Sequence, residues 1–143
     1  MISSRSLNDL DMRVRMMAEK HRELCAAEGI DLLIFCTYRD NEAQAAEYAK
    51  GRTVPGPIRT NAKPGYSMHQ YKLAYDCVPM RNGKPVWNNK AVEDAKLWRL
   101  VGELGEKAGL TWAGRWAGKL KETAHFQWTG GLTIEELLEG KRP

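Results

Sequence analysis

Two short histidine-containing stretches, far apart in the chain, constrain its fold most. Residues 67–76 read Ser-Met-His-Gln-Tyr-Lys-Leu-Ala-Tyr-Asp, and residues 122–127 read Glu-Thr-Ala-His-Phe-Gln. Together they supply two imidazoles, His69 and His125, and two carboxylates, Asp76 and Glu122. Two imidazoles and one carboxylate as ligands, with a further carboxylate as base, are the components of a catalytic zinc site. Such a site requires a fold that brings the two stretches together.

The spacing within the first stretch requires a bend. His69 and Asp76 are seven positions apart, so a straight strand would place them on opposite faces. A helix would place them on one face but about 10 Å apart along its axis. Neither arrangement lets both side chains reach one metal ion through bonds of about 2 Å. We therefore expect a turn or bulge around residues 70–72.

The second stretch predicts where the catalytic groups lie. A strand over residues 123–128 would point His125 into a cleft and its apolar neighbours into the core. Glu122 would then lie at the entry of the strand, where it could accept a proton from the attacking water and pass it to the leaving amine. Arg39 follows a predicted strand and is the candidate cation for the developing oxyanion.

Structural roles for the same residues remain open at this point. His125, beside an aromatic residue, is often simply hydrogen-bonded, and Arg39 after a strand is often a surface ion-pair partner. His21 competes as a third metal ligand. It shares an apolar stripe at helical spacing with Leu10 and Val14, which favours a position at the edge of the core.

Periodicity and turn residues predict an α+β fold. We predict helices over residues 6–28, 41–50 and 89–108, and a short last helix that begins with a capping box at Thr133–Glu136. Strands are predicted over residues 31–38, 69–79, 110–112 and 123–128, with a turn at Asn82-Gly83. The pattern indicates a small, mainly antiparallel sheet with helices packed on it. We expect one domain over residues 1–143, with the zinc site in a cleft at the sheet.

Residues 51–66 predict a long loop, because they contain three prolines and three glycines. Connections of this length are usually functional or disordered, and the position just before Ser67 favours a function. The loop carries basic residues, and the whole chain has a net charge of +4. Such a balance attracts polyanions, either nucleic acid or an anionic wall polymer. No helix-turn-helix or zinc-finger spacing supports nucleic acid.

Composition also indicates the compartment. No apolar run approaches the roughly 20 residues that cross a membrane, and the N-terminal residues lack the apolar core of a signal peptide. We therefore expect synthesis in the cytoplasm. The three cysteines, an odd number without a CxxC spacing, are expected to be reduced and to act mostly as small apolar residues.

The combined motif is more specific than its parts. Ser67-x-His69-x6-Asp76 followed by Glu122-x-x-His125 resembles the signature of the zinc D,D-peptidases and L-alanyl-D-glutamate endopeptidases of cell-wall metabolism. Tyr38-Arg39 with Gln44 is similar to the Arg-x4-Gln element of that family. The Pro-Gly-Tyr-Ser-Met-His run resembles its phage-encoded branch. The resemblance covers roughly residues 30–130.

The resemblance also implies roles for individual residues. Zn²⁺ would be bound by His69, Asp76 and His125, and Glu122 would be the catalytic base. Arg39 would contact the substrate or the transition state. Ser67 and Gln44 would belong to the substrate-binding side of the site. Ser67 would position the substrate or a neighbouring ligand, and Gln44 would be a supporting residue.

One position departs from the family pattern. Lys72 stands where the family usually has glycine, which suits a bend with positive φ. Lysine adopts that conformation at a cost of about 1 kcal/mol, unless the turn is built differently. No metal ligand is lost, so the departure concerns the geometry of the turn. Glu122 stands where some members have aspartate.

The resemblance implies a zinc metallopeptidase that cuts the peptide stems of peptidoglycan at the L-alanyl-D-glutamate bond, as a phage endolysin. We expect a monomer without a separate wall-binding domain, released from the cytoplasm to the wall through a holin pore, with no membrane insertion and no nucleic-acid partner. One alternative is a D-Ala-D-Ala carboxypeptidase or dipeptidase of the same fold. An alternative of a different class is a non-catalytic module, either zinc-stabilised or a basic binder.

Overall fold

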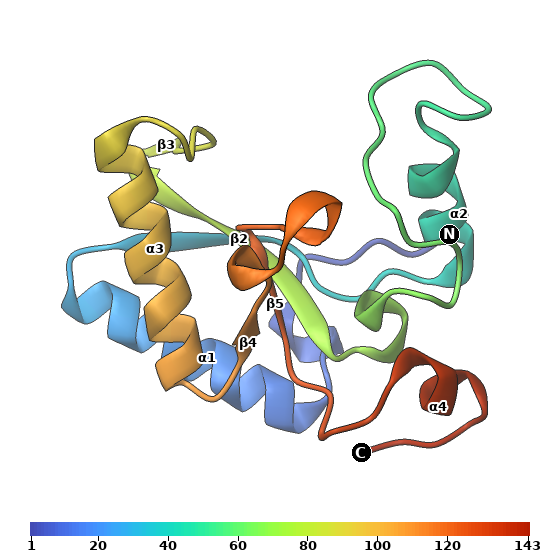
Figure 1. Ribbon diagram of the computed structural model, residues 1–143. Coiled ribbons are helices and arrows are strands. Elements are labelled where there is room, and N and C mark those ends of the chain that lie inside the picture. Colours follow the sequence, from blue (N-terminus) through green and yellow to red (C-terminus); the bar gives the residue numbers. More distant parts are fainter.

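The computed structural model describes residues 1–143 and is built around an antiparallel sheet with helices against it (Figure 1). The strands follow the order β1-β2-β5-β4, and β3 pairs with β2. Every pairing between these strands is antiparallel. The predicted α+β class is therefore confirmed. The strands are β1 (Asp31–Cys36), β2 (Ala74–Arg81), β3 (Lys84–Pro85), β4 (Thr111–Trp112) and β5 (His125–Gln127).

Four α-helices accompany the sheet, and α1 and α3 pack against each other and against its strands (Figure 1). Carboxylate or hydroxyl caps define where three of them begin: Asp11 caps α1, Asp40 caps α2, and Thr133 forms a capping box with Glu136 at α4. None of the helices has the length and apolarity needed to cross a membrane. The helices are α1 (Met12–Ala27), α2 (Asn41–Ala49), α3 (Val92–Lys107) and α4 (Ile134–Leu138), with 3-10 turns η1 (Leu7–Asp9), η2 (Met68–Tyr71), η3 (Ala113–Arg115) and η4 (Gly118–Leu120).

The core lies between the sheet and the helix pair α1–α3. Tyr75 of β2 and Phe126 of β5 are fully buried there and stack on each other. His21 of α1 joins them, with Nδ1 2.7 Å from the Tyr75 hydroxyl and Nε2 2.8 Å from the carbonyl oxygen of Val101. Gly105 lets α3 approach, because a Cβ there would lie 2.4 Å from the Phe126 ring. His21 is therefore a core residue, as its stripe predicted, and belongs to no metal site.

Several element boundaries differ from the sequence prediction. The first helix begins at Met12 rather than at residue 6, because η1 and the Asp11 cap precede it. The third begins at Val92 rather than at residue 89. The prediction of extended backbone over residues 69–79 was wrong for its first part, where η2 replaces the strand. The Asn82-Gly83 turn is confirmed, and both of its residues have positive φ in the β2–β3 hairpin.

The loop over residues 51–66 contains no helix or strand, as predicted, and extends beside α2 (Figure 1). It is anchored to α2 by two side chains. Arg52 donates to the carbonyl oxygens of Tyr48 and Thr60, and Gln44 donates to the carbonyl oxygen of Ala62. These bonds hold the second half of the loop at the edge of the site.

All three cysteines are buried and free, as expected. Burial raises the pKa of the Cys25 thiol to about 12 and that of Cys77 well above its ordinary value. At neutral pH these two thiols are protonated, so they act as small apolar residues of the core.

Candidate active site

Strand register brings the two histidine stretches together. Asp76 of β2 is paired with His125 of β5 on one side and with Cys36 of β1 on the other. One carboxylate oxygen of Asp76 lies 3.1 Å from Nδ1 of His125 and 3.3 Å from Nε2 of His69. The two predicted histidine ligands therefore meet at one oxygen of the third, Asp76, on the face of the sheet opposite to Tyr75 and Phe126.

The bend that the spacing required is present. Ser67 and Gln70 form a capping box that begins η2, with the Ser67 hydroxyl accepting from the His69 N–H. Lys72 then takes the left-handed conformation, at φ 63° and ψ 27°, and its N–H donates to the carbonyl oxygens of Met68 and His69. The chain reverses within these residues, which returns His69 to the level of Asp76. Lysine thus adopts the conformation for which the family pattern has glycine.

Each histidine is held in the tautomer that leaves one nitrogen free for a metal. Nδ1 of His69 lies 2.7 Å from the carbonyl oxygen of Thr37, which only accepts, so in the neutral ring this nitrogen carries the proton and Nε2 is left to bind a metal. Nε2 of His125 lies 2.8 Å from Oε1 of Gln127, which also accepts, so Nδ1 is the bare nitrogen of this ring. Both bare nitrogens face Asp76.

This arrangement attracts a cation. Burial by itself would raise the pKa of Asp76, but His69 and His125 hold it well below its usual range. Burial would likewise lower the pKa of His69, and the Asp76 charge reverses that effect and raises it. Without a metal, Nε2 of His69 therefore also holds a proton that faces Asp76, and a bound cation would take the place of that proton. Tetrahedral bonds of about 2.0–2.1 Å separate neighbouring ligand atoms by about 3.3 Å, close to the two distances to Asp76. The two distances to Asp76 therefore suit a zinc ion, but the group whose ligand atoms all lie within 4.8 Å of one another consists of Cys36, His69 and Asp76 and leaves out His125.

Cys36 offers a rival third ligand. Its Sγ, together with atoms of His69 and Asp76, belongs to a group of possible ligand atoms that all lie within 4.8 Å of one another. However, Sγ lies 3.7 Å from Nδ1 of His69, and this nitrogen already donates its proton to the carbonyl oxygen of Thr37. Asp76 faces the other ring nitrogen, Nε2. Cys36 thus contacts the opposite edge of the ring. His125 lies 3.1 Å from the same oxygen of Asp76, so Cys36 and His125 both stand beside this carboxylate, and His125 as the third ligand stays a prediction.

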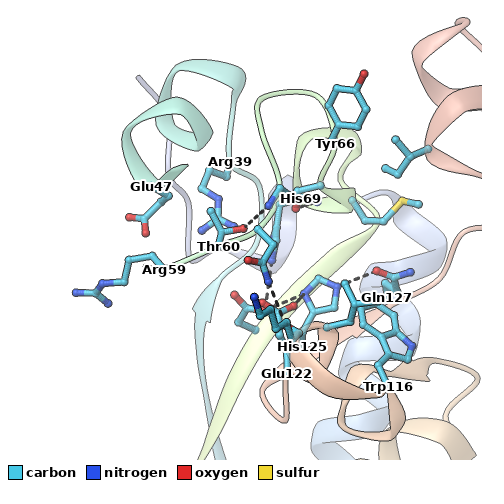
Figure 2. A pocket seen from close by; sticks show the side chains of 18 residues that line it. Arg39, Glu47, Arg59, Thr60, Tyr66, His69, Trp116, Glu122, His125 and Gln127 are labelled. Atoms are coloured by element: carbon cyan, nitrogen blue, oxygen red, sulfur yellow. Dashed lines mark hydrogen bonds and ion pairs between the residues drawn. The ribbon is translucent and has the colours of Figure 1, made fainter. Parts of the chain in front are cut away.

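Glu122 has the position expected of a base rather than a ligand. It lies in the turn that leads into β5, and its side chain is half exposed. Its Oε2 lies 4.0 Å from Nδ1 of His125, beside the ligand group without closing on it (Figure 2). Its carboxylate thus faces solvent at the edge of the predicted zinc site.

Arg39 is held in place by a buried glutamine. Gln44 has no exposed surface, and its Oε1 accepts from Nε of Arg39 at 2.8 Å and from Gln70 at 3.1 Å. Gln44 is the only hydrogen-bond partner of the Arg39 side chain, so both terminal amines of the guanidinium remain available. Because its amide is enclosed in this way, Gln44 supports Arg39 rather than meeting a substrate directly.

A cavity of about 390 Å³ opens in front of these groups (Figure 2). Arg39, Ser67 and the loop residues 59–62 line one side, and Trp116 and Glu122 line the other. Asn61 connects the two sides by donating to the carbonyl oxygen of Lys119 at 3.1 Å. The long loop therefore forms one wall of this cavity.

Comparison with known proteins identifies the family. A family model for D-alanyl-D-alanine carboxypeptidases of peptidase family M15 matches residues 60–128, a range that includes His69, Asp76, Glu122 and His125. The chain is also 31% identical, over 127 residues, to the peptidoglycan L-alanyl-D-glutamate endopeptidase CwlK of Bacillus subtilis, an alignment that covers 84% of this chain and 74% of CwlK. The chain belongs to peptidase family M15.

Solved structures share the M15 fold. The L-Ala D-Glu endopeptidase ChiX of Serratia marcescens superposes with a TM-score of 0.61 at 18% identity, over 95% of this chain and 92% of ChiX. A variant of the vancomycin-resistance D,D-pentapeptidase VanY, in complex with Zn(II), superposes with a TM-score of 0.58 at 19% identity, over 90% of this chain and 83% of VanY. The resemblance noted from the sequence motifs is thus confirmed, and the chain is a peptidase of a family that acts on peptidoglycan.

The structure adds residues to this M15 site that the sequence did not reveal. Thr37 and Gln127 set the tautomers of the two histidines, and the Trp116 ring lies 5.9 Å from that of His125. Gln70 both closes the capping box and donates to Gln44. The sequence does carry a signal for the role of Gln70, because Ser-x-x-Gln is a capping-box pattern. No sequence pattern signals the contact between Thr37 and His69, since this contact depends on where η2 meets the end of β1.

Proposed function

We propose that this protein is a zinc-dependent peptidoglycan peptidase that hydrolyses the L-alanyl-D-glutamate bond of the peptide stem. The observation that carries the proposal is the convergence of two bare histidine nitrogens on one oxygen of Asp76, with Glu122 exposed beside them. A buried ligand group with an accessible carboxylate next to it is what metal-assisted hydrolysis requires. Similarity to CwlK supports the choice of bond.

Zinc would be held by Nε2 of His69, the Asp76 carboxylate and Nδ1 of His125. When bound, zinc lowers the pKa of a water molecule and polarises the scissile carbonyl. Thr37 and Gln127 contribute by holding the imidazoles in the tautomers that present these nitrogens. The chain would thus supply three ligands on one side and leave the other side open to the cavity.

Glu122 would act as base and then as acid. Its exposed carboxylate would accept a proton from the attacking water and return it to the leaving amine. Arg39 would bind an oxygen of the substrate or of the transition state through its two free terminal amines. Gln44 would fix the direction of that guanidinium, and Ser67 would hold the turn that carries His69.

One alternative keeps the site and changes the bond. The matching family model is described by D-alanyl-D-alanine carboxypeptidase activity, and a VanY structure in complex with D-Ala-D-Ala superposes with a TM-score of 0.62. A carboxypeptidase of this kind would use the same ligands and base but would bind the free C-terminal carboxylate of the stem.

A role in host lysis extends the proposal. We expect a phage endolysin that is made in the cytoplasm, reaches the wall through a holin pore and acts there as a monomer. The net charge of +4 suits an anionic wall, which a basic surface attracts. Lysis of susceptible cells after co-expression with a holin, and survival without the holin, would test this role.

Digestion of purified peptidoglycan tests the chemistry. The zinc-loaded protein should release fragments with a new D-glutamate amino terminus, identified by mass spectrometry after labelling of free amines. New D-alanine released from the stem terminus would instead support the carboxypeptidase. Cleavage that persists in Glu122→Ala would exclude the proposed base, and the absence of any new amine would favour a binding module.

A further inference from the structure

A second cavity meets the active site from the other side. It has a volume of about 620 Å³ and is lined partly by Asp76, Glu122 and His125, which also line the first cavity. Two of the predicted zinc ligands and the predicted base therefore border both cavities. A substrate that extends in both directions from the scissile bond would occupy both, so the chemistry of the second cavity indicates what lies on its side of the bond.

The second cavity has an aromatic edge. Phe35 lines it, and the Trp87 ring packs against Phe35 edge to face, with ring centroids 5.2 Å apart and an interplanar angle of 73°. Trp87 remains 57% exposed. An indole with more than half of its surface in solvent offers apolar area to a ligand.

The segment that carries Trp87 is held firmly. The indole N–H of Trp98 in α3 lies 3.0 Å from the carbonyl oxygens of both Val86 and Asn88, on either side of Trp87. Asn89 then donates to the Thr123 hydroxyl at 3.0 Å, across the cavity wall. This leaves Oδ1 of Asn89 without a protein partner, as an acceptor at the cavity edge. The aromatic ring and the acceptor are thus placed before any ligand arrives.

The two cavities differ in chemistry. The first contains Arg39 and Arg59, which suit carboxylates. The second combines an aromatic edge with an amide acceptor, a pairing that suits the apolar face and the acetamido N–H of an N-acetylated sugar. Lys90 and Lys121 also line the second cavity, but both are exposed and can turn to solvent.

We propose that Phe35, Trp87 and Asn89 form a saccharide subsite for the N-acetylmuramyl sugar that carries the peptide stem. This inference rests on the proposed L-alanyl-D-glutamate cleavage. In peptidoglycan the L-alanine is joined directly to the lactyl group of muramic acid, so this bond lies one residue from the sugar. On the other side of the bond, D-glutamate carries a free α-carboxylate, which the arginines of the first cavity would bind. The sugar therefore occupies the second cavity.

The test compares one peptide with and without its sugar. Zinc-loaded wild-type protein should cleave an N-acetylmuramyl-L-alanyl-D-glutamyl stem peptide with a kcat/KM about tenfold above that of the free stem peptide. Trp87→Ala should bring this ratio to about one and leave cleavage of the free peptide unchanged. Trp87→Phe keeps an aromatic ring and should retain most of the advantage.

The controls separate this inference from the proposed function. Met16→Ala changes another exposed apolar side chain, on α1, and should keep the wild-type ratio. Two results would overturn the saccharide subsite and leave the peptidase activity standing. One is an equal kcat/KM of the wild type on both peptides, and the other is an equal loss of kcat/KM on both peptides in Trp87→Ala. Cleavage of neither peptide at the L-alanyl-D-glutamate bond would overturn both. Thermal unfolding of each variant shows whether its fold is intact.

Discussion

The two sides of the active site are built differently. On the sheet side, His69, Asp76 and His125 have side-chain exposures of 2%, 17% and 8%, and each makes hydrogen bonds to other protein groups. On the rim, the Glu122 side chain is 50% exposed and makes no hydrogen bond to the protein. Strand register and buried partners thus determine the position of the predicted ligand group, whereas only the turn before β5 places the predicted base.

This difference separates two functions within one site. Buried groups with fixed partners keep a binding geometry in place before the metal arrives. An exposed carboxylate is free to approach water and the leaving group during the reaction. Substitutions on the sheet side should therefore change metal binding and stability, while substitutions on the rim should change turnover alone.

The largest effect should come from the oxygen that both histidines share. Asp76→Ala removes the carboxylate that draws the cation, so we expect no stoichiometric zinc and no detectable cleavage of peptidoglycan. Metal analysis after gel filtration measures the first, and release of amino termini measures the second. Asp31→Ala, at the exposed start of β1, is the control and should keep both. A fully zinc-loaded Asp76→Ala protein would place the metal elsewhere.

Glu122→Gln should separate turnover from binding. The amide has nearly the same shape but cannot accept the proton, so we expect cleavage to fall by about 10³-fold. Zinc content and the thermal unfolding temperature should stay at wild-type values, because the side chain is exposed and makes no bond. If zinc is lost together with activity, Glu122 belongs to the ligand group and the contrast between the two sides fails.

Acid should destabilise the core that supports the sheet side. Burial lowers the pKa of His21 to about 4 from an ordinary value of 6.5, so the folded protein holds this ring neutral. The neutral His21 ring contributes fully to stability above about pH 6.5. As the pH falls towards 4, the free energy of unfolding should decrease by about 3 kcal/mol. Urea unfolding of the chelator-treated protein across this range measures the loss. His21→Gln, which does not titrate there, should show a flatter dependence, and equal slopes would contradict the assignment.

Gln127 should affect zinc affinity rather than zinc stoichiometry. Gln127→Leu removes the acceptor that fixes the tautomer of His125, and we expect zinc affinity to fall by about 10- to 100-fold. Competition with a chelator measures the affinity. Gln127→Glu keeps an acceptor at the same position and should bind zinc about as tightly as the wild type. Unchanged affinity in Gln127→Leu would show that strand register alone orients the ring.

The smallest effect should lie in the bend. Lys72→Gly relieves the positive φ but loosens the unfolded chain, and these effects oppose each other, so we expect a change in unfolding free energy below about 1 kcal/mol. Lys72→Val places a β-branched residue in the same conformation and should destabilise the fold by about 1–2 kcal/mol. Urea unfolding compares the two. A large stabilisation in Lys72→Gly would show that lysine strains the turn more than we infer.

Much of this site could be predicted, because its spacing carried geometric information. The seven positions between His69 and Asp76 already required a bend, and the structure places it at η2 and Lys72. The separate prediction of a strand over residues 69–79 was wrong over residues 69–71, where η2 lies. There the local capping box of Ser67 and Gln70 outweighs the alternation of the sequence.

The partners of the histidines could not be predicted in the same way. Thr37 meets His69 only because β1 ends where η2 begins, and Cys36 lies beside Asp76 only through the register of β1 with β2. Such contacts join residues far apart in the chain, and no local pattern encodes them. The contact between Gln127 and His125 could have been predicted, because the two residues are two positions apart on one strand and therefore share a face.

X-ray absorption at the zinc edge tests the central claim most directly. If His69, Asp76 and His125 hold the metal, the first coordination shell contains only nitrogen and oxygen, at about 2.0–2.1 Å. The spectrum should show no sulfur scatterer, and Cys36→Ser should leave it unchanged. A sulfur atom at about 2.3 Å that disappears in Cys36→Ser would mean that the metal is bound by Cys36, and the ligand group proposed for this site would be wrong.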